Sequence, residues 1–151
     1  MAIMQFEEKT VDSLTVGDFA LFTKTVSETD ITLYAGISAD FAPVHMNEPF
    51  GQGTRFGGRV AHPMLTGAMV GGAIFRLLSP GSYPIKREFQ MEAPVYPGDT
   101  VTIRAEVAAL DRDKKTVSVQ FEAYNQKREL VLCGTSLEGM DLMDAEINRR
   151  E

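Results

Sequence analysis

The most apolar segment of this chain, residues 60–78, is the feature that most constrains its fold. His62, Pro63 and Arg76 interrupt it, and its uninterrupted part, residues 64–75, is well short of the roughly 20 residues that cross a bilayer. The segment is rich in small residues that let neighbouring strands approach closely: Gly67, Ala68, Gly71, Gly72 and Ala73. The sequence therefore predicts a long helix buried in the protein's own core, not a membrane span.

Short elements with clear turn signals surround this segment. Ser27, with Asp30 three residues later, has the pattern of a helix N-cap, and a long loop rich in proline and glycine follows the helix. Alternation of apolar and polar residues predicts strands after Gly98-Asp99. The expected elements are strand 19–26, helix 28–36, loop 37–58, helix 60–78, and strands 83–94, 101–107, 117–123 and 129–137. We expect one α+β domain over residues 1–151, with an antiparallel sheet wrapped around the apolar helix and a polar tail from about residue 141.

Charge and cysteine content narrow the possible partners and compartment. The net charge is −6, and no run of Lys or Arg exceeds two residues, so a nucleic-acid partner is not expected. The single cysteine, Cys133, cannot form an intramolecular disulfide, and the first ten residues lack a secretory pattern. We expect a cytoplasmic protein.

The long loop carries the residues best suited to proton transfer. The chain has two histidines, His45 and His62, and Asp40 lies five residues before His45 with Pro43 between them. A carboxylate and an imidazole on one constrained loop can share a water molecule as acid and base. Structural roles stay open at this point: a turn or cap role for Asp40, a hydrogen-bonded half-buried place for His45, and a backbone-positioning or capping role for His62.

Other chemistries have weaker support in the sequence. The two histidines are 17 residues apart and no His-x-x-x-His or Cys-x-x-Cys pair is present, so no metal site is expected. Cys133 lies in a predicted strand and is interpreted as a small buried hydrophobic residue rather than a nucleophile.

Three segments together resemble the MaoC-like, or type 2, enoyl-CoA hydratases. Residues 34–45, YAGISADFAPVH, are similar to that family's aromatic, then Ser/Thr, then Asp-x-Asn-Pro-x-His signature. Residues 58–66, GRVAHPMLT, are similar to the family's start of the central helix, and residues 89–100 to its strand and turn that end in Pro-x-x-x-Gly-Asp. The resemblance covers most of residues 30–107.

The resemblance implies a hot-dog fold, a homodimer or higher homo-oligomer, and (R)-specific hydration or dehydration of an acyl thioester, carried by CoA or by acyl carrier protein. No metal or redox cofactor is implied, since CoA enters as part of the substrate. The family's catalytic pair maps onto Asp40 as general base on water and His45 as the residue that holds the water and manages the proton at the α-carbon. The helix start at His62, Pro63 and Met64 is implied as the substrate-binding site that stabilises the thioester oxygen. We expect this pair to lie beside an apolar channel for the acyl chain.

Two departures from the family keep other functions open. Ala42 replaces the asparagine between Asp and Pro, and Pro63 replaces the glycine after the helix-start histidine, where it removes an N–H donor. A neighbour such as Met64 would then supply the donor. The alternatives are a non-catalytic acyl-binding or partner-subunit protein, and a related acyl-CoA lyase or thioesterase. Four cations are weighed as contacts for CoA phosphates or as plain surface charges: Arg55, Arg59, Lys86 and Arg87.

Overall fold

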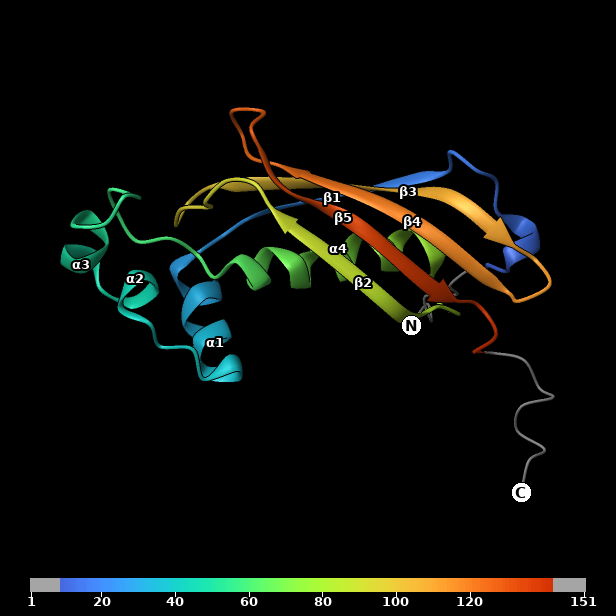
Figure 1. Cartoon of the computed structure of the whole chain (residues 1–151), viewed down its shortest axis with the longest axis horizontal. Helices are drawn as coiled ribbons and strands as arrows, with labels where there is room; N and C mark the ends of the chain where they lie inside the picture. Colours follow the sequence, from blue (N-terminus) through green and yellow to red (C-terminus); the bar gives the residue numbers. More distant parts are fainter. Residues whose placement is uncertain (1–8, 143–151) are drawn as a thin grey trace, which may run out of the picture.

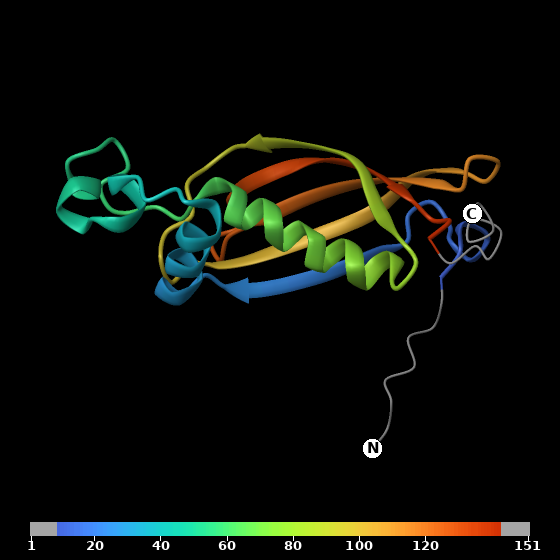
Figure 2. The same ribbon diagram turned by 90° about the horizontal axis from the view of Figure 1, so that it is seen from below.

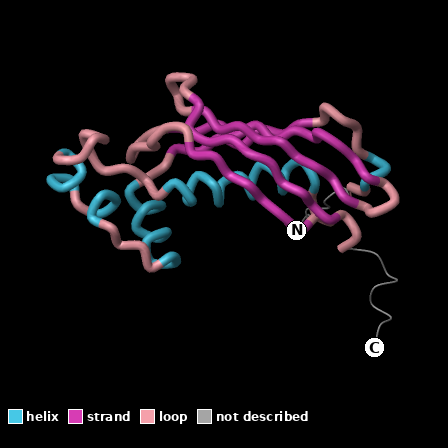
Figure 3. The backbone as a smooth tube through the Cα atoms, viewed as in Figure 1, coloured by secondary structure: helices cyan, strands magenta, loops and turns pink. Residues whose placement is uncertain are grey.

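The chain forms one curved sheet around one long helix, as the computed structural model shows for the residues it describes, 9–142 (Figure 1, Figure 3). The strands are β1 (Phe19–Thr25), β2 (Tyr83–Met91), β3 (Thr100–Asp111), β4 (Thr116–Tyr124) and β5 (Leu130–Gly139). The helices are η1 (Val11–Ser13), α1 (Glu28–Ser38), α2 (Pro43–Met46), α3 (Glu48–Gln52) and α4 (Pro63–Leu78). The strands pair antiparallel in the order β1-β3-β4-β5-β2. The predicted α+β hot-dog arrangement is confirmed.

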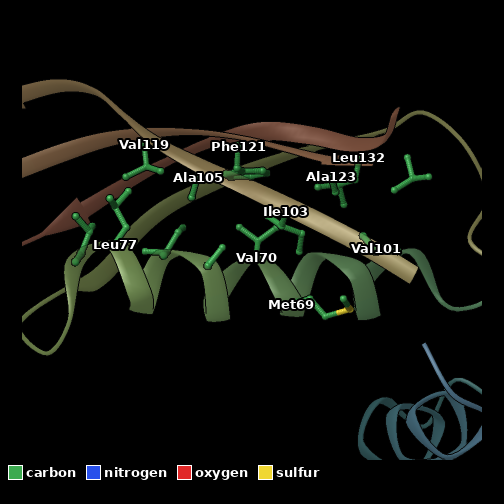
Figure 4. Close-up of a cluster of buried hydrophobic side chains, with 14 of the residues drawn as sticks. Met69, Val70, Leu77, Val101, Ile103, Ala105, Val119, Phe121, Ala123 and Leu132 are labelled. Atoms are coloured by element: carbon green, nitrogen blue, oxygen red, sulfur yellow. The ribbon is translucent and has the colours of Figure 1, made fainter. Parts of the chain in front are cut away.

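Helix α4 lies along the concave face of the sheet and forms the core with it (Figure 2). Val70 and Leu77 of the helix are buried against the alternate residues of the central strands, Phe121 of β4 among them (Figure 4). Every second residue of β3 from Val101 to Val107 is fully buried, as the alternation in the sequence predicts. The sheet does not cover the whole of α4, because the side chains of Met64 and Phe75 remain 42% and 50% exposed.

Helix α1 begins at the predicted cap. The Ser27 side chain accepts a hydrogen bond from the Asp30 N–H, and the Asp30 carboxylate accepts one from the Ser27 N–H. Burial opposes ionisation of Asp30, but bonds from Lys24 and Ser27 outweigh it and lower its pKa to about 2. The helix ends two residues later than expected, at Ser38, and its C-cap residue Ala39 has a left-handed φ of 58°. The left-handed backbone of Ala39 changes the direction of the chain just before Asp40.

The segment predicted as an irregular loop, residues 37–58, contains regular structure. It holds the end of α1 and two short helices, α2 and α3, which begin with prolines at their first turns. In both views of the ribbon these two helices lie beyond the end of the sheet (Figure 1, Figure 2). The sequence did not predict these two helices, because helices of four and five residues have too few turns to show a hydrophobic period. The glycines and prolines of the segment indicated a loop instead.

Other differences from the expected elements are small and have local causes. Helix α4 begins at Pro63 instead of residue 60, and β2 ends at Met91, because the backbone of residues 92–93 turns to bond Val131 O. Cys133 is half-buried, with its thiol 3.7 Å from a Glu92 carboxylate oxygen, so its interpretation as a buried hydrophobic residue is wrong. Among the described residues, none of the helices is long and apolar enough to cross a membrane. The expected polar tail lies largely outside the described residues.

Candidate active site

Asp40 and His45 lie next to each other at the start of the projecting segment. Asp40 follows the left-handed turn at Ala39, and His45 lies in helix α2, which Pro43 begins. The Asp40 Oδ2 atom is 3.8 Å from His45 Nε2. The other carboxylate oxygen, Oδ1, accepts a hydrogen bond from the Ala42 N–H at 3.1 Å. The turn role that the sequence left open for Asp40 is therefore real, and it leaves Oδ2 facing the imidazole.

The environment of His45 fixes which ring nitrogen carries the proton. His45 Nδ1 lies 2.8 Å from the carbonyl oxygen of Val60, which can only accept a hydrogen bond. Nδ1 therefore holds the proton in the neutral ring, and Nε2 presents its lone pair toward Asp40. The His45 side chain is 9% exposed, whereas that of Asp40 is 51% exposed. One fixed imidazole and one solvent-accessible carboxylate thus face each other 3.8 Å apart, a separation that one water molecule can bridge from the side.

His62 supports both members of the pair without capping the helix. It occupies the N-cap position of α4, but its side chain makes no cap hydrogen bond, so the side-chain cap, one of the two roles left open for it, is not observed. Its Nε2 atom instead donates to the backbone carbonyl of Asp40 at 2.8 Å, and its ring stacks on that of His45 at 3.9 Å. The backbone-positioning role considered from the sequence is the one observed. Its Nδ1 atom is buried and has no hydrogen-bond partner.

Asp40, His45 and His62 place three potential metal-ligand atoms within 4.8 Å of one another. The two imidazoles are stacked with only 28° between their planes, so their in-plane lone pairs do not converge on one point. Each ring also uses its second nitrogen on a backbone carbonyl. This geometry suits proton transfer better than ion binding, and metal-free chemistry stays a prediction.

A cavity of about 210 Å³ is lined in part by residues that precede and begin α4. Its lining is mainly apolar and includes Val60, Pro63, Thr66, Met91, Val95 and Leu132. Neither Asp40 nor His45 lines it, so the expectation that the pair lies beside an apolar channel is not met within one chain. The apolar side chains of Phe41 and Met64, 60% and 42% exposed, follow Asp40 and His62 in the sequence.

Sequence reasoning missed Thr66. Its hydroxyl is buried without a hydrogen-bond partner, and the residue lines the cavity together with Pro63, one helical turn earlier. The spacing of three residues after Pro63 was the signal that would have identified it.

Three of the four cations weighed as CoA contacts are engaged elsewhere. Arg59 pairs with Glu28 and Glu48, Arg87 with the buried Glu138, and Lys86 with Glu88. Arg55 lies 5.0 Å over the Phe56 ring and lines the cavity. Of the four, Arg55 has the position closest to what a ligand phosphate needs.

Comparisons with known proteins agree with this architecture. The profile of the family described as MaoC like domain matches residues 15–128. An (R)-specific enoyl-CoA hydratase of Rhodospirillum rubrum is 41% identical over 103 residues, which are 68% of this chain and 72% of that protein. The solved (R)-hydratase of Aeromonas caviae superposes with a TM-score of 0.81 at 29% identity and covers 85% of this chain and 98% of its own. The unliganded R-hydratase of Pseudomonas aeruginosa superposes with a TM-score of 0.81 at 30% identity and covers 87% of this chain and 84% of its own.

Proposed function

This chain belongs to the MaoC-like dehydratase family, and we propose that it is an (R)-specific enoyl-CoA hydratase, a hydro-lyase that uses Asp40 and His45 as its acid and base. The observation that carries this proposal is the carboxylate oxygen of Asp40 opposite the unprotonated Nε2 of His45, 3.8 Å away. The hydratase names of the relatives support an acyl thioester as substrate. A cytoplasmic location stays a prediction.

A water molecule that bridges the pair from the side can donate one hydrogen bond to each member. As its oxygen bonds to the β-carbon of the enoyl thioester, Asp40 accepts one proton from it while His45 holds it through the other hydrogen. The proton on Asp40 then passes through Nε2 of His45 to the α-carbon, where the new C–H bond forms. The pair takes one proton from water and returns one to the substrate, so its own charge is restored. The exposed side chains of Phe41, next to Asp40 in the sequence, and of Met64, two residues after His62, offer apolar surface for the acyl group.

The thioester oxygen becomes negative as the carbon–oxygen bond forms and needs a hydrogen-bond donor. At the start of α4, Pro63 has no N–H, and the Leu65 N–H donates to His62 O at 2.9 Å. Met64 carries the remaining early N–H of this helix, at its positive end. Met64 is therefore the donor in this proposal, and the substrate-binding role of His62 and Pro63 is to place it.

The test is hydration of crotonyl-CoA, followed by loss of its ultraviolet absorbance. We expect turnover with (R)-3-hydroxybutyryl-CoA as product, and faster turnover than with longer enoyl chains if the acyl site is short. A thiol reagent run in parallel measures release of free CoA. Binding of acyl-CoA without turnover would favour the non-catalytic alternative, and thiol release without hydration would favour a thioesterase.

We also propose a homodimer that pairs along β2, because the opposite edge, β1, is partly covered by arginine side chains: Arg76 donates a hydrogen bond to Leu21 O at 3.2 Å. Ile85 and Met91 on β2 are 52% and 42% exposed, whereas Phe19 and Phe22 on β1 lie under arginines. Sedimentation at micromolar concentration should give twice the 16.6 kDa of one chain. Ile85→Glu should lower this mass, and Leu21→Glu on β1 should not. A wild-type mass of one chain would contradict the dimer.

A further inference from the structure

Arg59 connects the three helices that carry or flank the candidate pair. Its guanidinium bonds Glu28 Oε1 at 2.5 Å, in the first turn of α1, and Glu48 Oε2 at 3.2 Å, in the first turn of α3. A third contact, 3.5 Å long, runs from the guanidinium to the His45 carbonyl oxygen at the end of α2. α1 leads through Ala39 into Asp40, so one side chain links the helix before the carboxylate to the helix that holds the imidazole.

The backbone around Arg59 is tightly held as well. Its N–H donates to Glu48 Oε2 at 3.3 Å, and the next residue, Val60, exchanges bonds with α2 through Val44 O and His45 Nδ1. A Cβ on Gly51 of α3 would lie 2.5 Å from Arg59 N, so the two segments pack at backbone distance. The Arg59 N–H and guanidinium together lower the pKa of the Glu48 carboxyl, which keeps this anion charged.

We propose that Arg59 is a positioning residue that sets the separation and mutual orientation of Asp40 and His45. This inference rests on the proposed function. The side chain of Arg59 is 18% exposed and touches neither reacting atom of the pair, so it acts through α1, α2 and α3. Helices α2 and α3 lie beyond the end of the sheet, where few other elements can hold them (Figure 2). A planar guanidinium can bond two carboxylates and a carbonyl at fixed angles, which an ammonium cannot.

Arg59→Met tests this role, because it removes the fork of donors and keeps a long side chain. We expect kcat on crotonyl-CoA to fall about 10- to 100-fold with KM changed less than about threefold, since a displacement near 1 Å costs rates of this order. Arg59→Lys should lower kcat less than Arg59→Met does, because lysine keeps the positive charge. Arg112→Met is the matched control, because its ion pair with Asp12 joins exposed side chains near the start of the described chain. It should keep full kcat.

A second readout separates positioning from general stability. In an Asp40→Asn background, Arg59→Met should lower kcat less than about threefold further, because there is no longer a pair to align. An equal further loss in that background would overturn the proposal.

The NMR signals of the two imidazoles give a test that does not need turnover. Those of His45 should move in folded Arg59→Met and stay in place in Arg112→Met. Unchanged His45 signals in Arg59→Met overturn the positioning role whether or not the wild type is a hydratase. If the wild type and Arg59→Met both hydrate crotonyl-CoA at the same rate, this inference alone is overturned. If the wild type does not hydrate crotonyl-CoA, the proposed function is overturned.

Discussion

Asp40→Asn is expected to reduce kcat on crotonyl-CoA by about 10²- to 10⁴-fold, the usual contribution of a positioned acid or base. Asparagine keeps a carbonyl oxygen for the Ala42 N–H, so the turn that Asp40 Oδ1 makes should persist. The backbone bond from His62 to Asp40 O does not depend on the side chain. The variant thus removes the proton acceptor and little else.

Two measurements complete this test. The melting temperature of Asp40→Asn should stay near that of the wild type, and Asp113→Asn, which changes an exposed turn carboxylate in the same way, should keep full activity. Wild-type rates in Asp40→Asn, over several acyl chain lengths, would remove the Asp/His mechanism from consideration.

Gly134→Ala is expected to have the largest effect on stability, a loss of at least about 3 kcal/mol. Gly134 lies in β5 opposite Phe89 of β2 and Phe121 of β4. A Cβ there would collide with the backbone carbonyl oxygen of Glu88 and lie 2.8 Å from the Phe121 ring. Backbone cannot move aside as a flexible side chain can, so the edge strand β2 has to shift. For a chain of this size, the melting temperature should fall by about 6–12 °C.

Gly36→Ala is the control for this substitution. Gly36 lies within α1, and a Cβ there meets nothing within 4 Å. Alanine is the better helix former, so this variant should gain about 0.5–1 kcal/mol. Thermal melting that ranks Gly134→Ala level with Gly36→Ala would mean that the β2–β5 contact is looser than described.

The sheet and the long helix were predictable because their signals extend over many residues. Alternation repeats through all of β4 and through β3 as far as Val107, and the apolar character of α4 covers several turns. The Ser27–Asp30 cap was also predictable, since it depends only on residues three apart. The proximity of the Asp40 and His45 side chains was predictable because both lie in one short segment that contains Pro43.

The parts that sequence could not predict depend on contacts between distant residues. Arg59 reaches Glu28, 31 positions away, and no local pattern records that pairing. His62 was placed at the correct helix terminus, but its bond to Asp40 O crosses 22 positions, so the sequence could not decide between its positioning and capping roles. Hydropathy likewise could not predict which side of α4 is exposed, because Met64 and Phe75 are as apolar as their buried neighbours.

Asp40 serves the protein through two separable parts: its main chain anchors the histidine before α4, and its carboxylate faces the imidazole of α2. Evolution can therefore exchange the reactive group while the anchor persists. Under the proposed mechanism, a relative that has lost this one carboxylate would retain the same backbone and the same stacked rings and would still be inactive.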